Sequence, residues 1–119
     1  MKKVFSVKDS ASDDVLLLEV ADNFLSRFRG LMGRRRLPPG QGLLLAPCSS
    51  VHMCFMRFSV DVVYLDRDYH ILKIVRNLRP WIGLSLCPGA WGAAEFAAGE
   101  AERLGLSSGR QLIEKRNHE

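Results

Sequence analysis

The stretch that decides the fold is residues 59–65, SVDVVYL, which continues through residues 66–69, DRDY, into residues 70–76, HILKIVR. Runs of β-branched and aromatic residues favour β-strands, and the tetrapeptide between the two runs has the residues of a short hairpin turn. Side chains alternate between the two faces of a strand. Because the first run is largely apolar on both faces, we expect it at the centre of a sheet.

Further runs of strand length lie on either side of this hairpin, at residues 3–7, 15–20, 42–46, 50–57, 91–97 and 110–114. The first two are separated by turn-forming residues, which predicts a second hairpin. Four consecutive runs between residues 42 and 76 are typical of a β-meander.

Two segments have helical features. Apolar residues recur with a helical period between Phe24 and Met32, and Asp22 is positioned to cap that helix. Residues 99–104 predict one or two helical turns ended by Gly105. The sequence therefore predicts a mainly β protein, an antiparallel or mixed β-sandwich or β-barrel with one or two short helices.

Length and composition indicate one globular domain over residues 1–119, since 47% of the residues are hydrophobic and 25% are charged. Charges at residues 8–14 interrupt any apolar core of a signal peptide, and prolines break the longest uncharged run, residues 37–56. The three cysteines fit reduced thiols better than a disulfide framework. We therefore expect a soluble, cytoplasmic monomer that does not contact a membrane.

The charge distribution is uneven, although the net charge is only +4. No acidic residue occurs between Asn23 and Val60, a stretch that contains Arg27, Arg29, Arg34, Arg35, Arg36 and Arg57. Such a stretch attracts phosphate or an acidic partner, but it is also typical of a solvated loop or helix face.

The side chains best suited to metal binding or nucleophilic chemistry lie in one extended run. Alternation places Cys48, Ser50, His52, Cys54 and Met56 on one face and leaves an apolar face for the core. The two thiols and the imidazole, joined by Cys87, would make a ligand set for zinc or copper, but the spacing is not a standard one and the sequence favours buried structural thiols. We expect no metal and no cofactor.

Asp61 is the acidic residue that stands out, because a charge inside an apolar strand is costly to bury without partners. We predict that an arginine, or backbone amides of residues 30–36, bind this carboxylate. The alternative is catalytic: His52 with Asp61 or Cys54 would suit a hydrolase or transferase, although no common enzyme motif is present. Trp81 and Trp91 lie near the ends of a segment, residues 80–92, that has the composition of a loop.

Several motifs together resemble the family called domain of unknown function 192. They are RGLMGR at residues 29–34, GLLL at 42–45, VHM at 51–53 continuing to Phe58, VDVVYLD at 60–66, and AGEAERLGL at 98–106 with Gly109. The resemblance covers about residues 15–115. It implies a small, mostly β domain with no established activity, cofactor or substrate, and it marks Gly30, Leu31, Met32 and Asp61 as candidate site lining. The chain departs from the family's usual aromatic-Trp-Met core at Cys54-Phe55-Met56, and from a frequent Asn-Thr at Phe58-Ser59.

From these observations we expect a non-catalytic binding module for a small anionic molecule or an acidic peptide. Its cleft would form where residues 29–36 approach the strands from His52 to Asp61. Binding of single-stranded nucleic acid ranks below the enzyme alternative, because the phenylalanines occupy positions assigned to the core. The candidate ligand-binding residues are Arg29, Gly30, Leu31, Met32, Arg34, His52, Met56, Arg57 and Asp61.

Overall fold

The computed structural model describes residues 2–12, 14–21, 37–53 and 56–115. Within these ranges the chain forms nine β-strands and one short helix. In chain order they are β1 (Lys2–Val7), β2 (Val15–Ala21), β3 (Gln41–Leu45), β4 (Ser50–His52), β5 (Val60–Leu65), β6 (Ile71–Leu78), β7 (Leu84–Leu86), β8 (Gly92–Ala97), α2 (Glu100–Arg103) and β9 (Leu112–Lys115).

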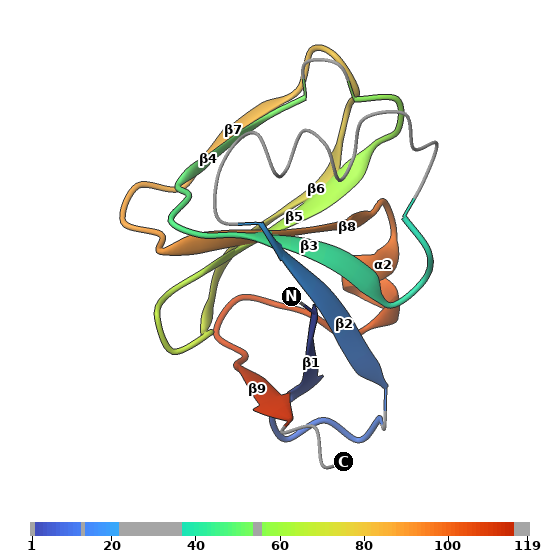
Figure 1. The fold of residues 1–119 in the computed structure, drawn as a ribbon, viewed down its shortest axis with the longest axis vertical. Coiled ribbons are helices and arrows are strands. Elements are labelled where there is room, and N and C mark those ends of the chain that lie inside the picture. The colour runs from blue at the N-terminus through green and yellow to red at the C-terminus, as the bar shows by residue number, and fades with distance from the viewer. Residues whose placement is uncertain (1, 13, 22–36, 54–55, 116–119) are drawn as a thin grey trace.

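Seven strands form one sheet in the order β6-β5-β8-β3-β2-β1-β9, and β4 and β7 form a separate two-stranded sheet. The large sheet is mixed, because β2 and β3 pair in parallel while its other pairs are antiparallel. It curls into a half-barrel, and β4 and β7 lie at the opposite end of the long axis from β9 (Figure 1). The predicted mainly β class is thus confirmed.

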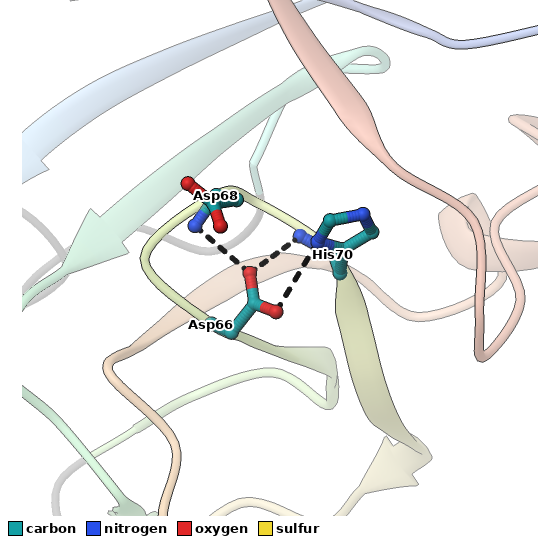
Figure 2. Close-up of side chains that lie close together, drawn as sticks. All are labelled: Asp66, Asp68 and His70. Carbon is teal, nitrogen blue, oxygen red and sulfur yellow. Dashed lines mark hydrogen bonds and ion pairs between the residues drawn. The ribbon is translucent and has the colours of Figure 1, made fainter.

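Both predicted hairpins form. β1 pairs with β2, and β5 pairs with β6 through a turn in which the Asp66 carboxylate accepts the backbone N–H groups of Asp68 and His70, each at 2.9 Å (Figure 2). A short polar side chain that bonds to the backbone two residues later is the usual way an aspartate stabilises a turn. In the large sheet β6 is an edge strand, and β5 lies between β6 and β8.

The predicted meander is wrong beyond this hairpin. β3 pairs with β2 and β8, and β4 pairs only with β7 among the described strands. The reason is burial: β3 and β5 are apolar on both faces and take central positions, whereas β4 directs only Val51 fully inward. β4 is also shorter than predicted, since the chain turns at Met53, whose carbonyl accepts the Met56 N–H at 3.1 Å.

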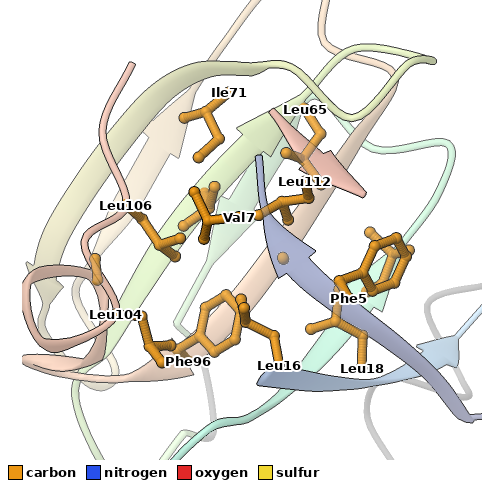
Figure 3. Close-up of a cluster of buried hydrophobic side chains, with 14 residues drawn as sticks. Phe5, Val7, Leu16, Leu18, Leu65, Ile71, Phe96, Leu104, Leu106 and Leu112 are labelled. Atoms are coloured by element: carbon orange, nitrogen blue, oxygen red, sulfur yellow. The ribbon is translucent and has the colours of Figure 1, made fainter. Parts of the chain in front are cut away.

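Two hydrophobic clusters occupy the two faces of the large sheet, as the alternation in β5 predicts. Val63 and Leu65 belong to the first cluster, which the curl of the sheet encloses together with α2 (Figure 3). Val60, Val62 and Tyr64 belong to the second cluster, which β4 and β7 cover. Burial on both faces is what fixes the register of β5.

The second predicted helix forms as α2, and Gly105 follows it with φ of +71°. Glycine adopts this left-handed conformation without the steric cost that a Cβ atom brings. The helix predicted near Phe24 to Met32 lies outside the described residues. No helix in the described part of the chain is long and apolar enough to cross a membrane.

Candidate functional site

The Asp61 carboxylate is buried, with 1% of the residue exposed, and backbone amides bind it. Oδ1 accepts the N–H of Asn77 at 2.9 Å, and Oδ2 accepts those of Gly99 and Ala101 at 2.9 and 3.0 Å. The described donors thus come from β6 and from the start of α2. Residues 30–36, which were predicted to supply them, lie outside the described residues. Asp61 therefore ties α2 and the edge strand to the centre of the sheet.

The described residues of the predicted cleft do not lie together. Met56 is buried in the second cluster, whereas Asp61 faces the first cluster on the opposite side of the sheet. His52 ends β4 on the side of the second cluster and is half-buried, so the proposed pairing of His52 with Asp61 is wrong: the sheet separates them. Arg57 is exposed. The remaining candidates, Arg29, Gly30, Leu31, Met32, Arg34 and Cys54, lie outside the described residues.

The polar centre of the second cluster is a pair of hydroxyl groups. Tyr64 Oη and Ser85 Oγ are 2.6 Å apart and link the large sheet to β7. Burial raises the pKa of Tyr64, which the Ser85 hydrogen bond opposes and the nearby Cys48, Cys87 and Glu95 reinforce. A phenol that keeps its proton at neutral pH acts here as a structural hydrogen-bonding group and not as a base.

Cys48 and Cys87 lie close to this pair. The zinc set weighed from the sequence does not form among the described residues, where Cys48, His52 and Cys87 do not bring ligand atoms together. The one described group within ligand distance is Asp66, Asp68 and His70 in the β5–β6 turn. There His70 Nδ1 lies 3.2 Å from Asp66 Oδ2, so the Asp66 oxygens are already engaged by the turn (Figure 2).

The most unusual surface of the molecule is apolar. Among the described residues seven large hydrophobic side chains are exposed, and four of them fall within six residues. We call these four the β7 surface: Trp81 (57% exposed), Ile82 (78%), Leu84 (65%) and Leu86 (55%). Single exposed apolar residues are ordinary, but four of them within one short segment are not.

The turn before β7 holds this surface in a fixed and strained conformation. Trp81 has φ of +68°, which costs energy for a bulky L-residue, and its N–H donates to the Met53 carbonyl at 2.7 Å. Gly83 packs so closely that a Cβ atom would lie 2.5 Å from the Arg79 carbonyl oxygen and 2.9 Å from Met53 Cγ. The exposed Trp81 side chain therefore depends on a strained backbone at Trp81 and on a glycine at position 83.

The segments that form the strands next to the β7 surface contain no acidic residue. Residues 37–60 and 69–94, which supply β4, β6 and β7, contain no aspartate or glutamate. Lys73 lies beside β7, because its Nζ donates to the Leu86 carbonyl at 2.9 Å, and Arg79 is exposed at the start of the turn. The surface is thus apolar with a cationic border.

Sequence reasoning missed this surface because residues 80–92 have the glycine and proline content of a loop. Two signals were available: the apolar alternation Ile82, Leu84, Leu86, and the absence of acids from 69 to 94. Trp91, at the other end of the segment, packs edge-on against Tyr69 at a centroid distance of 5.6 Å. The two tryptophans therefore have different roles, one packed and one exposed.

Comparison with known proteins identifies relatives but no activity. The family model DUF192, described as "Uncharacterized ACR", matches residues 6–113. A UPF0127 protein of Thermococcus sibiricus is 38% identical over an alignment of 72 residues. The alignment covers 54% of this chain and 44% of that protein. A UPF0127 protein of Pyrococcus abyssi is 36% identical over 70 residues, 54% of this chain and 56% of that protein. The match thus spans about half the length of these curated relatives.

Two solved structures share the fold. A protein of Sinorhizobium meliloti 1021, described as a "putative transcription regulator", superposes with a TM-score of 0.83 at 24% identity, covering 96% of this chain and 94% of that one. A protein of unknown function from Novosphingobium aromaticivorans superposes with a TM-score of 0.80 at 21% identity, covering 94% and 84%. At these identities the likeness concerns the fold alone.

Proposed function

This chain belongs to the DUF192 family, whose description assigns no activity, and we propose that it is a non-catalytic binding module for an acidic segment of a partner protein. The recognition site in this proposal is the β7 surface. We place the protein in the cytoplasm, in keeping with three cysteines whose number and spacing fit reduced thiols better than a disulfide framework.

The observation that carries the proposal is the exposed apolar group inside a part of the chain without carboxylates. Apolar contact supplies most of the affinity of an interface, and complementary charge at its border supplies specificity and fast association. Lys73 and Arg79 favour a partner that carries acidic residues beside its apolar ones.

The edge of β7 favours a peptide over a lipid surface. The Cys87 N–H donates to the Ser49 carbonyl and the Met53 N–H to the Gly83 carbonyl, on either side of the pairs Ser50–Leu86 and His52–Leu84. Antiparallel pairs alternate, so the N–H groups of Leu84 and Leu86 point away from β4. Hydrocarbon leaves such groups unsatisfied, whereas an extended peptide can accept from them.

The test is a titration with two short capped peptides, one alternating glutamate and leucine and the other alternating lysine and leucine. We expect the acidic peptide to shift the Trp81 fluorescence and the amide NMR signals of residues 81–86, with an affinity that falls as salt rises. Leu84→Ser combined with Leu86→Ser should weaken binding at least about tenfold. Ile113→Ser, an exposed apolar residue on β9, is the matched control and should leave binding unchanged.

Three outcomes overturn the proposal. Equal binding of both peptides would mean that charge plays no part, and no saturable binding at about millimolar concentration would mean that the surface has no such partner. Association with vesicles of phosphatidylserine and phosphatidylcholine, without binding of the acidic peptide, would assign the β7 surface to a membrane.

A further inference from the structure

A second candidate site is a hollow to which β7 contributes no residue. Three turns meet there: Lys8 and Asp9 from the β1–β2 connection, His70 from the β5–β6 turn, and residues 109–111 before β9. They surround an open hollow of about 320 Å³. This hollow is independent of the β7 surface and of the function proposed for it.

Backbone hydrogen bonds hold the walls of the hollow in place. The Lys8 N–H donates to the Gln111 carbonyl at 2.9 Å, and the Ile71 N–H donates to the Arg110 carbonyl at 2.7 Å. The Gln111 side chain reaches the Asp68 carbonyl at 2.9 Å, so all three turns are cross-linked. A site whose backbone is already fixed loses little entropy when a ligand binds.

The charged side chains around the hollow favour an anion. Lys8 and Arg110 both line it, and within the described part of the chain neither forms an ion pair with a carboxylate. The Arg110 guanidinium instead rests on two backbone carbonyls, those of Gly105 at 3.5 Å and Lys8 at 3.3 Å. Asp9 is the single acidic residue in the lining.

His70 also lines the hollow, in a defined orientation. Its Nδ1 lies 3.2 Å from Asp66 Oδ2, and this contact fixes the imidazole ring (Figure 2). We propose that the hollow binds a compact dianion of the phosphate type, with Lys8 and Arg110 as the cationic residues that contact it.

Inorganic phosphate is the probe, titrated at constant ionic strength and followed by the amide NMR signals of Lys8, Gly109 and Gln111. We expect a saturable shift, and a weaker one with acetate, because a dianion gains more from the two cationic side chains. Lys8→Gln should lower the phosphate affinity about tenfold, as expected for the loss of one charge-assisted hydrogen bond. Arg110→Gln should do the same.

Arg76→Gln removes an exposed cation from β6 outside the hollow and serves as the matched control. Lys8→Gln is the decisive variant if Arg110→Gln unfolds, since the Lys8 ammonium makes no described hydrogen bond that the fold would lose. Equal weakening by Arg76→Gln, equal shifts with acetate, or shifts that never saturate would each overturn the site and leave only general attraction of anions to a basic protein.

Discussion

The two faces of the large sheet are closed by different means. The curl of the sheet and α2 enclose the first face, and the Asp61 carboxylate joins them through three backbone amides. A separate two-stranded layer covers the second face, and the outer side of that layer is apolar and exposed. The first face is therefore enclosed within the fold, whereas the layer on the second face leaves apolar side chains exposed.

The largest effect expected from this contrast is at Asp61. Asp61→Ala removes the acceptor of three backbone N–H groups, one in a buried and two in part-buried hydrogen bonds, and should lower the free energy of unfolding by about 3 to 5 kcal/mol. Urea denaturation measures the loss. Asp68→Ala, at an exposed acid in the next turn, is the control and should change stability by no more than about 0.5 kcal/mol. A loss under about 1 kcal/mol at Asp61 would contradict its structural role.

A smaller effect is expected on the second face, where one hydroxyl pair joins the layers. Tyr64→Phe leaves the buried Ser85 Oγ without its partner and should cost about 1 to 2 kcal/mol. The double variant with Ser85→Ala should cost less than the sum of the two single changes. Additive losses in this double-mutant cycle would show that the two hydroxyl groups do not act as a pair.

The next effect depends on pH and concerns Glu100 of α2. A hydrogen bond from Arg103 lowers the pKa of Glu100, burial opposes it, and the Gly40 amide reinforces it. A depressed folded pKa stabilises the protein above the ordinary value of 4.5 and loses that contribution as pH falls through the folded pKa. Glu100→Gln should cost about 1 kcal/mol near pH 6, since the half-exposed Arg103 is screened by water, and nothing near pH 2. A difference that is independent of pH would contradict this assignment.

The smallest effect on stability is expected at the β7 surface. Trp81→Gly removes the strain of φ +68° while it deletes an exposed side chain, so stability should change by less than about 1 kcal/mol. Binding of the acidic peptide should nevertheless weaken at least about tenfold. Thermal unfolding and the peptide titration measure the two quantities on one sample. A large loss of stability would mean that Trp81 has a structural role.

The fold was more predictable than the site. Alternation in residues 60–65 gave the two buried faces, because the period of a strand depends only on backbone geometry. It could not give the neighbours of β3 and β4, which depend on residues distant in sequence such as those of β8. The burial of Asp61 and its need for backbone donors followed from the cost of a buried charge, but the identity of those donors depended on the position of α2. The apolar alternation of Ile82, Leu84 and Leu86 was present in the sequence, but the glycine and proline content of residues 80–92 favoured a loop over a strand.

The position of β8 affects how the chain is made. β8 lies between β5 and β3 in the large sheet, although it follows both by tens of residues. During synthesis from the N-terminus the earlier strands emerge first, yet the β5–β6 hairpin and the strands β1 to β3 have no direct pairing until residues 92–97 arrive. Pairings between distant residues form slowly. The large sheet therefore cannot assemble before residues 92–97 have been made, and β8 is the strand that joins its two halves.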